Sequence, residues 1–164
     1  MKRDGRSHAV PDCAGRRFGI VVARFYAELA DTLVDGAKRG LRDCKVDEEQ
    51  IAVFEVPGCF ELPLACRNLI EGDRFDGLVA LGVVIRGETP HFEYVAGECA
   101  RGIMAVQLAS GTPIGFGVLT TENLAQAQER AARKGGDKGY TAATAAAALV
   151  GLTSVTPRAG FRRN

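Results

Sequence analysis

Apolar residues along the chain follow two alternating patterns, short runs that are mostly apolar and longer stretches with helical spacing. The short runs are FGIVVA (18–23), IAVFEV (51–56, with Glu55 as its one charged residue), GLVALGVVI (77–85) and PIGFGVL (113–119). A run of this length is typical of a strand buried on both faces of a parallel sheet. The four runs therefore predict four buried strands.

Between and after these runs, apolar residues recur at every third or fourth position, which predicts helices. In the first such stretch, the residues that would share one face are Leu29, Leu33, Ala37 and Leu41. The predicted helices cover residues 27–41, 60–70, 90–108, 123–134 and 140–152. Strands followed by helices in strict alternation imply a parallel sheet with helices on both faces.

This order of elements predicts an α/β protein, a three-layer α/β/α sandwich with a four-stranded parallel sheet, flavodoxin-like in kind. The length of 164 residues suits one domain. We expect a single domain over 1–164, with an N-terminal arm (1–16) and a short basic C-terminal tail (157–164). Because right-handed crossovers bring the carboxyl ends of all the strands to one edge, a ligand is expected at that edge.

Aromatic, acidic, basic and histidine residues stand where the predicted strands end. The stretches at these ends are ARFYAE, VPGCFELP, IRGETPH and GVLTTEN, and the last leads into a helix that carries Arg130 and Lys134. Their convergence favours a binding or catalytic site more strongly than any single residue does.

The stretch IRGETPH combines a turn with a helix start. Gly87 allows the backbone to approach a ligand closely. Thr89 is a good N-cap, and Pro90 suits the first helical position. The free N–H groups and the dipole of such a terminus attract phosphate or carboxylate. These residues alone are equally consistent with an ordinary capped helix.

His91 is predicted to be the second residue of this helix. The dipole and the amide groups there disfavour imidazolium, whereas a bound phosphate would favour it, so one histidine could accept and later return a proton. The alternative is a surface residue without a role.

Other candidates also have two interpretations. Arg130 and Lys134 would share one helical face, either exposed to solvent or gripping an anion. Phe25 would pack in the core or stack on a flat heterocycle, and Glu61 would complement a helix dipole or accept hydrogen bonds from substrate hydroxyls. Cys59 has no histidine near it in sequence and is interpreted as a packing residue.

Composition excludes several classes of protein. With 21 basic and 20 acidic residues the net charge is +1, which argues against a dedicated nucleic-acid binder. Five cysteines without a CxxC pair suggest neither a disulfide framework nor a metal site. No secretory signal and no apolar stretch of about 20 residues are visible, so we expect no membrane partner and a cytoplasmic location.

These motifs closely resemble those of the lumazine synthase family, the penultimate enzymes of riboflavin biosynthesis. The resemblance runs in order from Phe18 to Leu152. The motifs that carry it are ARFYAELADTLVDGA, EVPGCFELP, ALGVVIRGETPHFEYV, FGVLTTENLAQAQERA and KGGDKG. Two departures are Tyr26, where many relatives have asparagine, and Cys59, which replaces the usual alanine.

The resemblance implies a transferase that forms 6,7-dimethyl-8-ribityllumazine, phosphate and water. The substrates would be 5-amino-6-(D-ribitylamino)uracil and 3,4-dihydroxy-2-butanone 4-phosphate, without a metal or an organic cofactor. An amine of the first would attack the ketone of the second to give an imine, proton removal would expel phosphate, and ring closure would follow.

The resemblance also assigns roles by motif position. His91 would be the catalytic residue for proton transfer. The pyrimidine and ribityl chain would meet Phe25, Cys59, Phe60, Glu61, Val83, Val84, Ile85 and Phe116. The phosphate would meet Gly87, Glu88, Thr89 and Arg130, with Lys134 in support. Phe116 and Lys134 would come from a neighbouring subunit.

Family members form pentamers, and the short KGGDKG link resembles that of members whose pentamers close into a 60-subunit icosahedral shell. We therefore expect a homopentamer and a shell, with riboflavin synthase as a candidate partner. Three alternatives stay open: a lumazine or flavin carrier without turnover, a structural compartment protein, and an unrelated flavodoxin-like phosphosugar enzyme.

Overall fold

The computed structural model of the chain describes residues 10–72 and 74–155. Residues 1–9 of the predicted arm and the whole predicted tail lie outside the described residues. No helix within the described part of the chain is both long and apolar enough to cross a bilayer.

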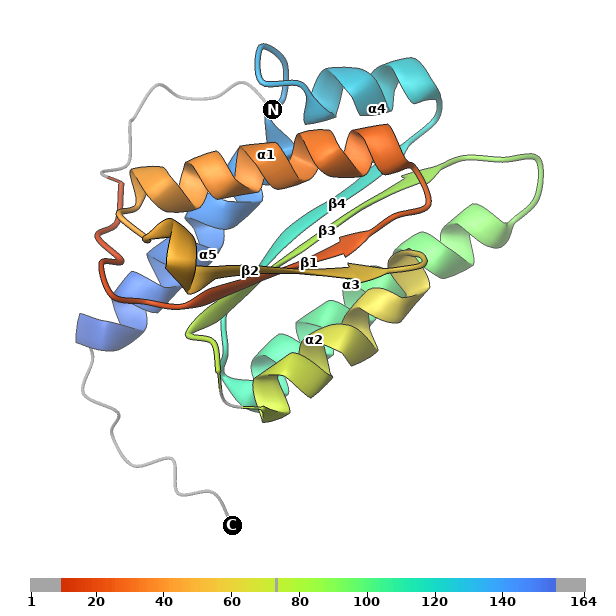
Figure 1. Ribbon diagram of the computed structural model, residues 1–164. Helices are drawn as coiled ribbons and strands as arrows, with labels where there is room; N and C mark the ends of the chain where they lie inside the picture. The colour runs from red at the N-terminus through yellow and green to blue at the C-terminus, as the bar shows by residue number, and fades with distance from the viewer. Residues whose placement is uncertain (1–9, 73, 156–164) are drawn as a thin grey trace.

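A four-stranded, fully parallel sheet forms the middle layer (Figure 1). Its strands are β1 (Phe18–Ala23), β2 (Ile51–Val56), β3 (Gly77–Ile85) and β4 (Ile114–Thr121), in the order β2-β1-β3-β4. The predicted bounds of the first three strands are confirmed. The fourth begins one residue later and ends two residues later than predicted.

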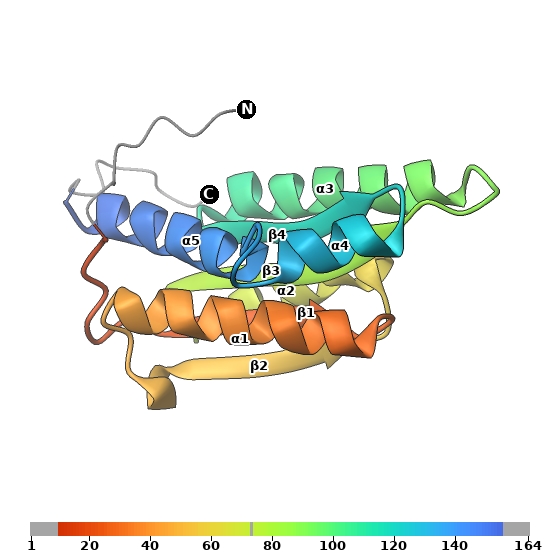
Figure 2. The same ribbon diagram turned by 90° about the horizontal axis from the view of Figure 1, so that it is seen from above.

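Helices cover both faces of the sheet, which confirms the predicted three-layer sandwich (Figures 1 and 2). One face carries α1 (Ala27–Asp43), α4 (Leu124–Ala131) and α5 (Lys138–Val155). The other carries α2 (Leu62–Glu71) and α3 (His91–Ser110). Two short 3₁₀ turns, η1 (Glu48–Gln50) and η2 (Cys59–Glu61), precede β2 and α2.

The core consists of two apolar clusters, one on each face of the sheet. Alternate residues of β1 divide between them: Ile20 and Val22 join the cluster under α1 and α5, and Val21 joins the cluster under α2 and α3. This division follows from the two-residue period of a strand. All three side chains are fully buried, and each contributes roughly 1.5–3 kcal/mol relative to exposure.

Three sequence predictions about these elements were wrong. β2 is an edge strand with only β1 beside it, so Val53 and Glu55 are exposed rather than buried. The predicted helix 60–70 begins as the 3₁₀ turn η2 and becomes an α-helix at Leu62. The predicted helix 123–134 ends at Ala131, because Ala132 takes an extended conformation (ψ 140°).

A largely buried ion pair fixes the link between α4 and α5. Arg39 on α1 donates two hydrogen bonds, of 3.1 and 3.0 Å, to the carboxylate of Asp137. The side chains are 19% and 20% exposed, the least exposed of the ion pairs in the described residues. Arg39 also lies over the ring of Tyr140, 5.8 Å from its centroid. These contacts hold the first turn of α5 against α1.

Candidate active site

The carboxyl ends of the parallel strands lie at one edge of the sheet. Ala23 pairs with Val56, and Ile85 pairs with Thr121, so the strands end close together. The segments that follow them carry Phe25, Cys59 to Glu61, and Gly87 to His91 (Figure 1). The predicted convergence of the four strand ends at one edge is thus confirmed.

Two aromatic rings are open to solvent at this edge. Phe25 is 75% exposed and Phe60 is 60% exposed. Phe25 meets Tyr26 edge to face, with ring centroids 5.0 Å apart, and lines a hollow of about 500 Å³ between the start of α1 and α4. Phe25 is therefore not a core residue, and its face is free to stack on a planar ligand.

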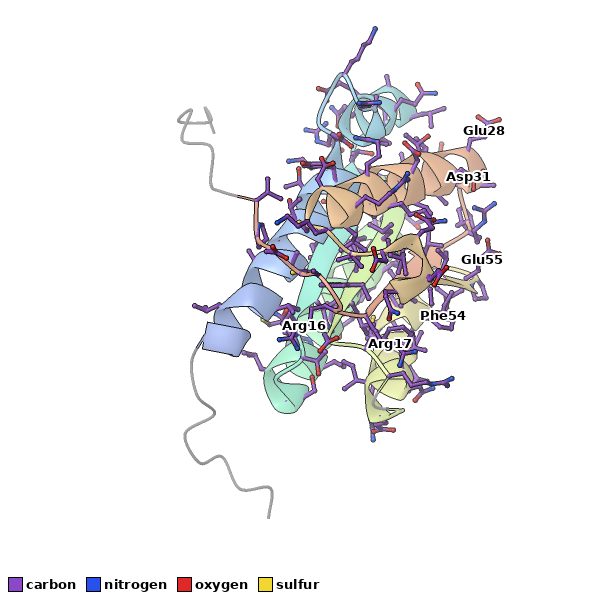
Figure 3. All side chains as sticks on the ribbon, turned by 60° about the vertical axis from the view of Figure 1, so that its left-hand side comes forward. Arg16, Arg17, Glu28, Asp31, Phe54 and Glu55 are labelled. Carbon is purple, nitrogen blue, oxygen red and sulfur yellow. The ribbon has the colours of Figure 1, made fainter. Side chains whose placement is uncertain are left out.

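Arg24, directly before Phe25, contacts both β2 and α1. The backbone N–H of Arg24 donates to the carbonyl of Val56 at 2.9 Å, which extends the pairing of β1 with β2 by one bond. Its guanidinium binds Asp31 on α1 and lies 3.6 Å from the carboxylate of Glu55. Figure 3 shows Glu55 and Asp31 on the same side of the molecule. Phe25 consequently projects from a fixed turn.

Cys59 is buried beneath the same edge. Its Sγ donates to the carbonyl of Val83 at 3.7 Å, and it occupies the space over Gly82, where a Cβ would lie 2.5 Å from the sulfur. Burial raises the pKa of this thiol to about 11. A thiol that stays protonated and buried is not a nucleophile, so the structure confirms Cys59 as a packing residue.

The buried thiols predict a loss of stability in alkali. Burial raises the pKa of Cys66 and of Cys99 from 9.0 to about 12. Above pH 9 the unfolded chain loses protons that the folded chain retains, so the free energy of unfolding should fall as pH rises from about 9 toward 12. Urea denaturation at pH 7 to 10.5 measures this slope. Cys66→Ala should be less stable at pH 7 but show a shallower slope, and equal slopes would contradict the prediction.

The stretch IRGETPH differs in detail from the prediction. His91 is the first residue of α3 and Pro90 is its N-cap, so Thr89 is not the cap and Pro90 is not the first helical residue. The Thr89 hydroxyl instead accepts a hydrogen bond from the N–H of His91 at 3.5 Å. Gly87, Glu88, Thr89 and His91 are all exposed. Because the first N–H groups of a helix lack intrahelical acceptors, this terminus still suits an anion.

Phe116 and Arg130 lie elsewhere on the chain, in a second hollow of about 190 Å³ beside β4. Phe116 is 45% exposed and pairs with Ala80. The last pair of the two strands, Ile85 with Thr121, lies five residues further along both of them. At about 3.3 Å per residue, Phe116 is roughly 16 Å from the carboxyl end of the sheet. The side chain of Arg130 is 44% exposed, and its nearest carboxylate is that of Glu129, 3.9 Å away.

Lys138 lines the same hollow, and Lys134 is not among its lining residues. The predicted helical face shared by Arg130 and Lys134 does not exist, because the helix ends between them at Ala131. Sequence reasoning missed Lys138, although it belongs to the KGGDKG motif. Its position depends on the ion pair of Asp137 with Arg39, for which the sequence gives no local signal.

Comparison with known proteins agrees with this geometry. The family model of 6,7-dimethyl-8-ribityllumazine synthase matches residues 15–154. The chain belongs to the 6,7-dimethyl-8-ribityllumazine synthase family. A member from Desulfatibacillum aliphaticivorans is 46% identical over 138 residues, which cover 84% of this chain and 89% of the relative. One from Syntrophus aciditrophicus (strain SB) is 47% identical over 138 residues, with 84% and 90% covered.

Membership of the 6,7-dimethyl-8-ribityllumazine synthase family confirms the predicted family, the enzyme class and the step of riboflavin biosynthesis. All the candidate site residues lie within the matched range. Among the described residues, no group of three or more His, Cys, Asp or Glu side chains is arranged to hold a metal ion.

Proposed function

We propose that the active site of this lumazine synthase is shared between two copies of the chain. One copy contributes the exposed rings and the start of α3 at the carboxyl edge of its sheet. The neighbour contributes the hollow beside β4. The observation that carries this proposal is the position of Phe116, which shares a hollow with Arg130 and lies roughly 16 Å from the edge.

In this proposal, the pyrimidine stacks on Phe25 and the ribityl hydroxyls donate hydrogen bonds to Glu61. Phe60, Cys59 and the end of β3 (Val83, Val84 and Ile85) enclose the ring, and Phe116 of the neighbour closes the site. The phosphate binds at Gly87, Glu88 and Thr89, opposite Arg130. Lys138 takes the supporting role that the resemblance assigned to Lys134, because Lys138 lines the hollow of Arg130.

The two substrates are 5-amino-6-(D-ribitylamino)uracil and 3,4-dihydroxy-2-butanone 4-phosphate. The amine attacks the ketone, water leaves, and an imine forms. His91 then removes a proton from the carbon chain, and the electron pair of that C–H bond expels phosphate. The resulting enol tautomerises to a ketone, and attack of the second amine on this carbonyl closes the ring with loss of water. Holding both substrates together contributes several kcal/mol, up to about 7–11 for ideal alignment.

A mixing experiment tests the shared site. The double variant His91→Ala/Phe25→Ala and the single variant Arg130→Ala are each expected to be poorly active. When the two are co-expressed, random assembly leaves about a quarter of the interfaces with both intact halves, so activity should recover to about a quarter of the wild-type rate. Lumazine absorbance measures turnover. Recovery no greater than the mean of the two separate variants would contradict a shared site.

His91→Ala is expected to lower kcat by about tenfold. General acid–base catalysis typically contributes 10²-fold or more, but phosphate is a good leaving group and needs less assistance. Binding of the pyrimidine, followed by fluorescence, should change by less than about twofold, because His91 is the first residue of α3 and directly follows the proposed phosphate turn. An unchanged kcat would remove His91 from the mechanism.

The assembly is part of the same proposal. Apolar side chains on α3 are widely exposed, with Tyr94 at 69%, Met104 at 51% and Leu108 at 75%. Such a surface supports burial against other copies, as in a homopentamer and a 60-subunit icosahedral shell. Native mass spectrometry distinguishes a monomer, a pentamer and a shell. A monomer that turns over both substrates would refute the shared site.

Two further expectations complete the proposal. All five cysteines are buried and unpaired, which suits a reducing compartment such as the cytoplasm. Riboflavin synthase, which would consume the product, is the candidate partner. Co-purification of the two enzymes from cells tests this association.

A further inference from the structure

Arg86 is the first residue after β3 and precedes the phosphate turn. Its backbone N–H donates to the carbonyl of Thr121 at 2.9 Å, which extends the pairing of β3 with β4. Its Nε donates to Glu122 at 2.8 Å, and its Nη1 donates to Glu93. The guanidinium also lies over the ring of Phe92, 4.3 Å from the centroid.

These contacts connect the ends of β3 and β4 with the first turn of α3. Glu122 follows β4, whereas Phe92 and Glu93 belong to the first turn of α3. The segment between Arg86 and Phe92 is the turn from Gly87 to His91. A single guanidinium therefore fixes both ends of a turn that contains a glycine and is otherwise exposed.

The charge of Arg86 is already matched by two carboxylates. The hydrogen bond with Arg86 lowers the pKa of Glu93, and the hydrogen bond with Glu93 raises the pKa of Arg86. Both groups therefore stay charged at neutral pH. The Nε and Nη1 donors of this guanidinium are thus directed at carboxylates instead of at a bound anion.

We infer that Arg86 is a positioning residue, which sets the geometry of the Gly87–His91 turn through Glu93, Glu122 and Phe92 and does not itself bind the phosphate. The inference rests on the proposed function, because that function places the phosphate and the proton transfer at this turn. Loss of Arg86 releases the turn and leaves Glu93 and Glu122 unpaired beside the anion. Loss of the two glutamates also releases the turn, yet it makes the surroundings more positive.

The two substitutions separate positioning from direct binding. Binding of inorganic phosphate, followed by ³¹P NMR, should weaken about tenfold in Arg86→Gln. It should also weaken, by about three- to tenfold, in Glu93→Ala/Glu122→Ala. A direct phosphate ligand predicts the opposite result for the glutamate pair, because the freed guanidinium and the lost negative charges would tighten binding.

Kinetics supply a second measurement. In both variants the KM of the phosphate-bearing substrate should rise and kcat should fall, whereas the KM of the pyrimidine changes less than about twofold. Arg67→Ala is the matched control, because it removes an exposed ion pair, to Glu71 at 2.8 Å on α2, away from the turn. This control should match the wild-type protein in both measurements.

Tighter phosphate binding in the glutamate variant, or unchanged binding in Arg86→Gln, would overturn the inference. Failure of the proposed function would look different. In that case the wild-type protein would not turn over the two substrates, while phosphate binding would still depend on Arg86.

Discussion

Arg130→Ala is expected to lower kcat/KM for the phosphate-bearing substrate by about 100-fold. The side chain of Arg130 is 44% exposed, and its polar partners among the described residues are the carboxylate of Glu129, at a loose 3.9 Å, and the carbonyl of Gln126, at 3.4 Å. Its guanidinium is therefore available to a dianionic ligand. Two charge-assisted hydrogen bonds to phosphate contribute roughly 3 kcal/mol, which corresponds to about two orders of magnitude.

The pyrimidine provides the internal reference for this prediction. In the proposed site it binds at the edge formed by Phe25 and Glu61, so its KM should change by less than about threefold in Arg130→Ala. Arg133→Ala is the matched control: Arg133 is exposed, carries the same charge three residues further on, and does not line the hollow beside β4. Steady-state kinetics with each substrate varied in turn measure both effects. Equal losses for the two substrates would contradict a phosphate role for Arg130.

Most of the sheet could be predicted because its signals are local. The runs 18–23, 51–56 and 77–85 became β1, β2 and β3 with unchanged bounds. Each run is followed by polar or turn residues that mark the end of the strand, so no neighbouring element competes for it. The alternation with helices then determines that the sheet is parallel, and hence which edge collects the loops.

The burial of β2 could not be predicted from the same pattern. IAVFEV, with Glu55 as its one charged residue, predicts a strand whether that strand lies in the middle of the sheet or at its edge. Only the strand order β2-β1-β3-β4 leaves Val53 and Glu55 exposed. That order is determined by how the crossover connections pack, and no single segment of the sequence specifies it.

The end of α4 depends on distant contacts. The sequence from 123 to 134 keeps a helical period, but the chain leaves the helix at Ala132, and Asp137 takes a left-handed conformation (φ 43°). The ion pair of Asp137 with Arg39, 98 residues away, stabilises this link. The prediction consequently named Lys134 as the partner of Arg130, whereas Lys138 lies in the hollow.

In the candidate site, too, some positions follow from local sequence signals and others depend on contacts between distant residues. Residues that directly follow a strand were placed correctly at the edge, because a parallel sheet leaves them no other position. Phe116 lies within β4, and its place relative to the edge depends on its pairing with Ala80. The role inferred for Arg86 depends on Glu122, 36 residues away. Local patterns predicted which segments form the candidate site, and non-local contacts determine its geometry.

Gly115→Ala is expected to destabilise the fold by about 3 kcal/mol, the upper part of the range for overpacked cores. Gly115 lies in β4 beside Val79, where α5 packs directly on the strand. A Cβ at this position would be 2.1 Å from the carbonyl oxygen of Ala142 and 3.2 Å from the Cβ of Ala146. The nearest atom belongs to the backbone, so no side-chain rotation relieves the contact and α5 must move away from the sheet. Urea denaturation at fixed protein concentration measures the loss, which corresponds to roughly 6–12 °C in Tm.

Gly151→Ala separates this steric effect from the general effect of replacing a glycine. Gly151 lies in α5, and a Cβ there would be 3.6 Å from the Cβ of Pro11, an ordinary van der Waals distance. Because alanine favours helix over glycine by up to about 1 kcal/mol, this variant should be as stable as the wild-type protein or more stable. The displacement of α5 in Gly115→Ala would also move Lys138, the first residue of that helix, so the KM of the phosphate-bearing substrate should rise as well. A loss of stability below about 1 kcal/mol in Gly115→Ala would contradict this prediction, because it would mean that α5 tolerates displacement from β4. The close contact between α5 and the sheet would then not determine the position of Lys138.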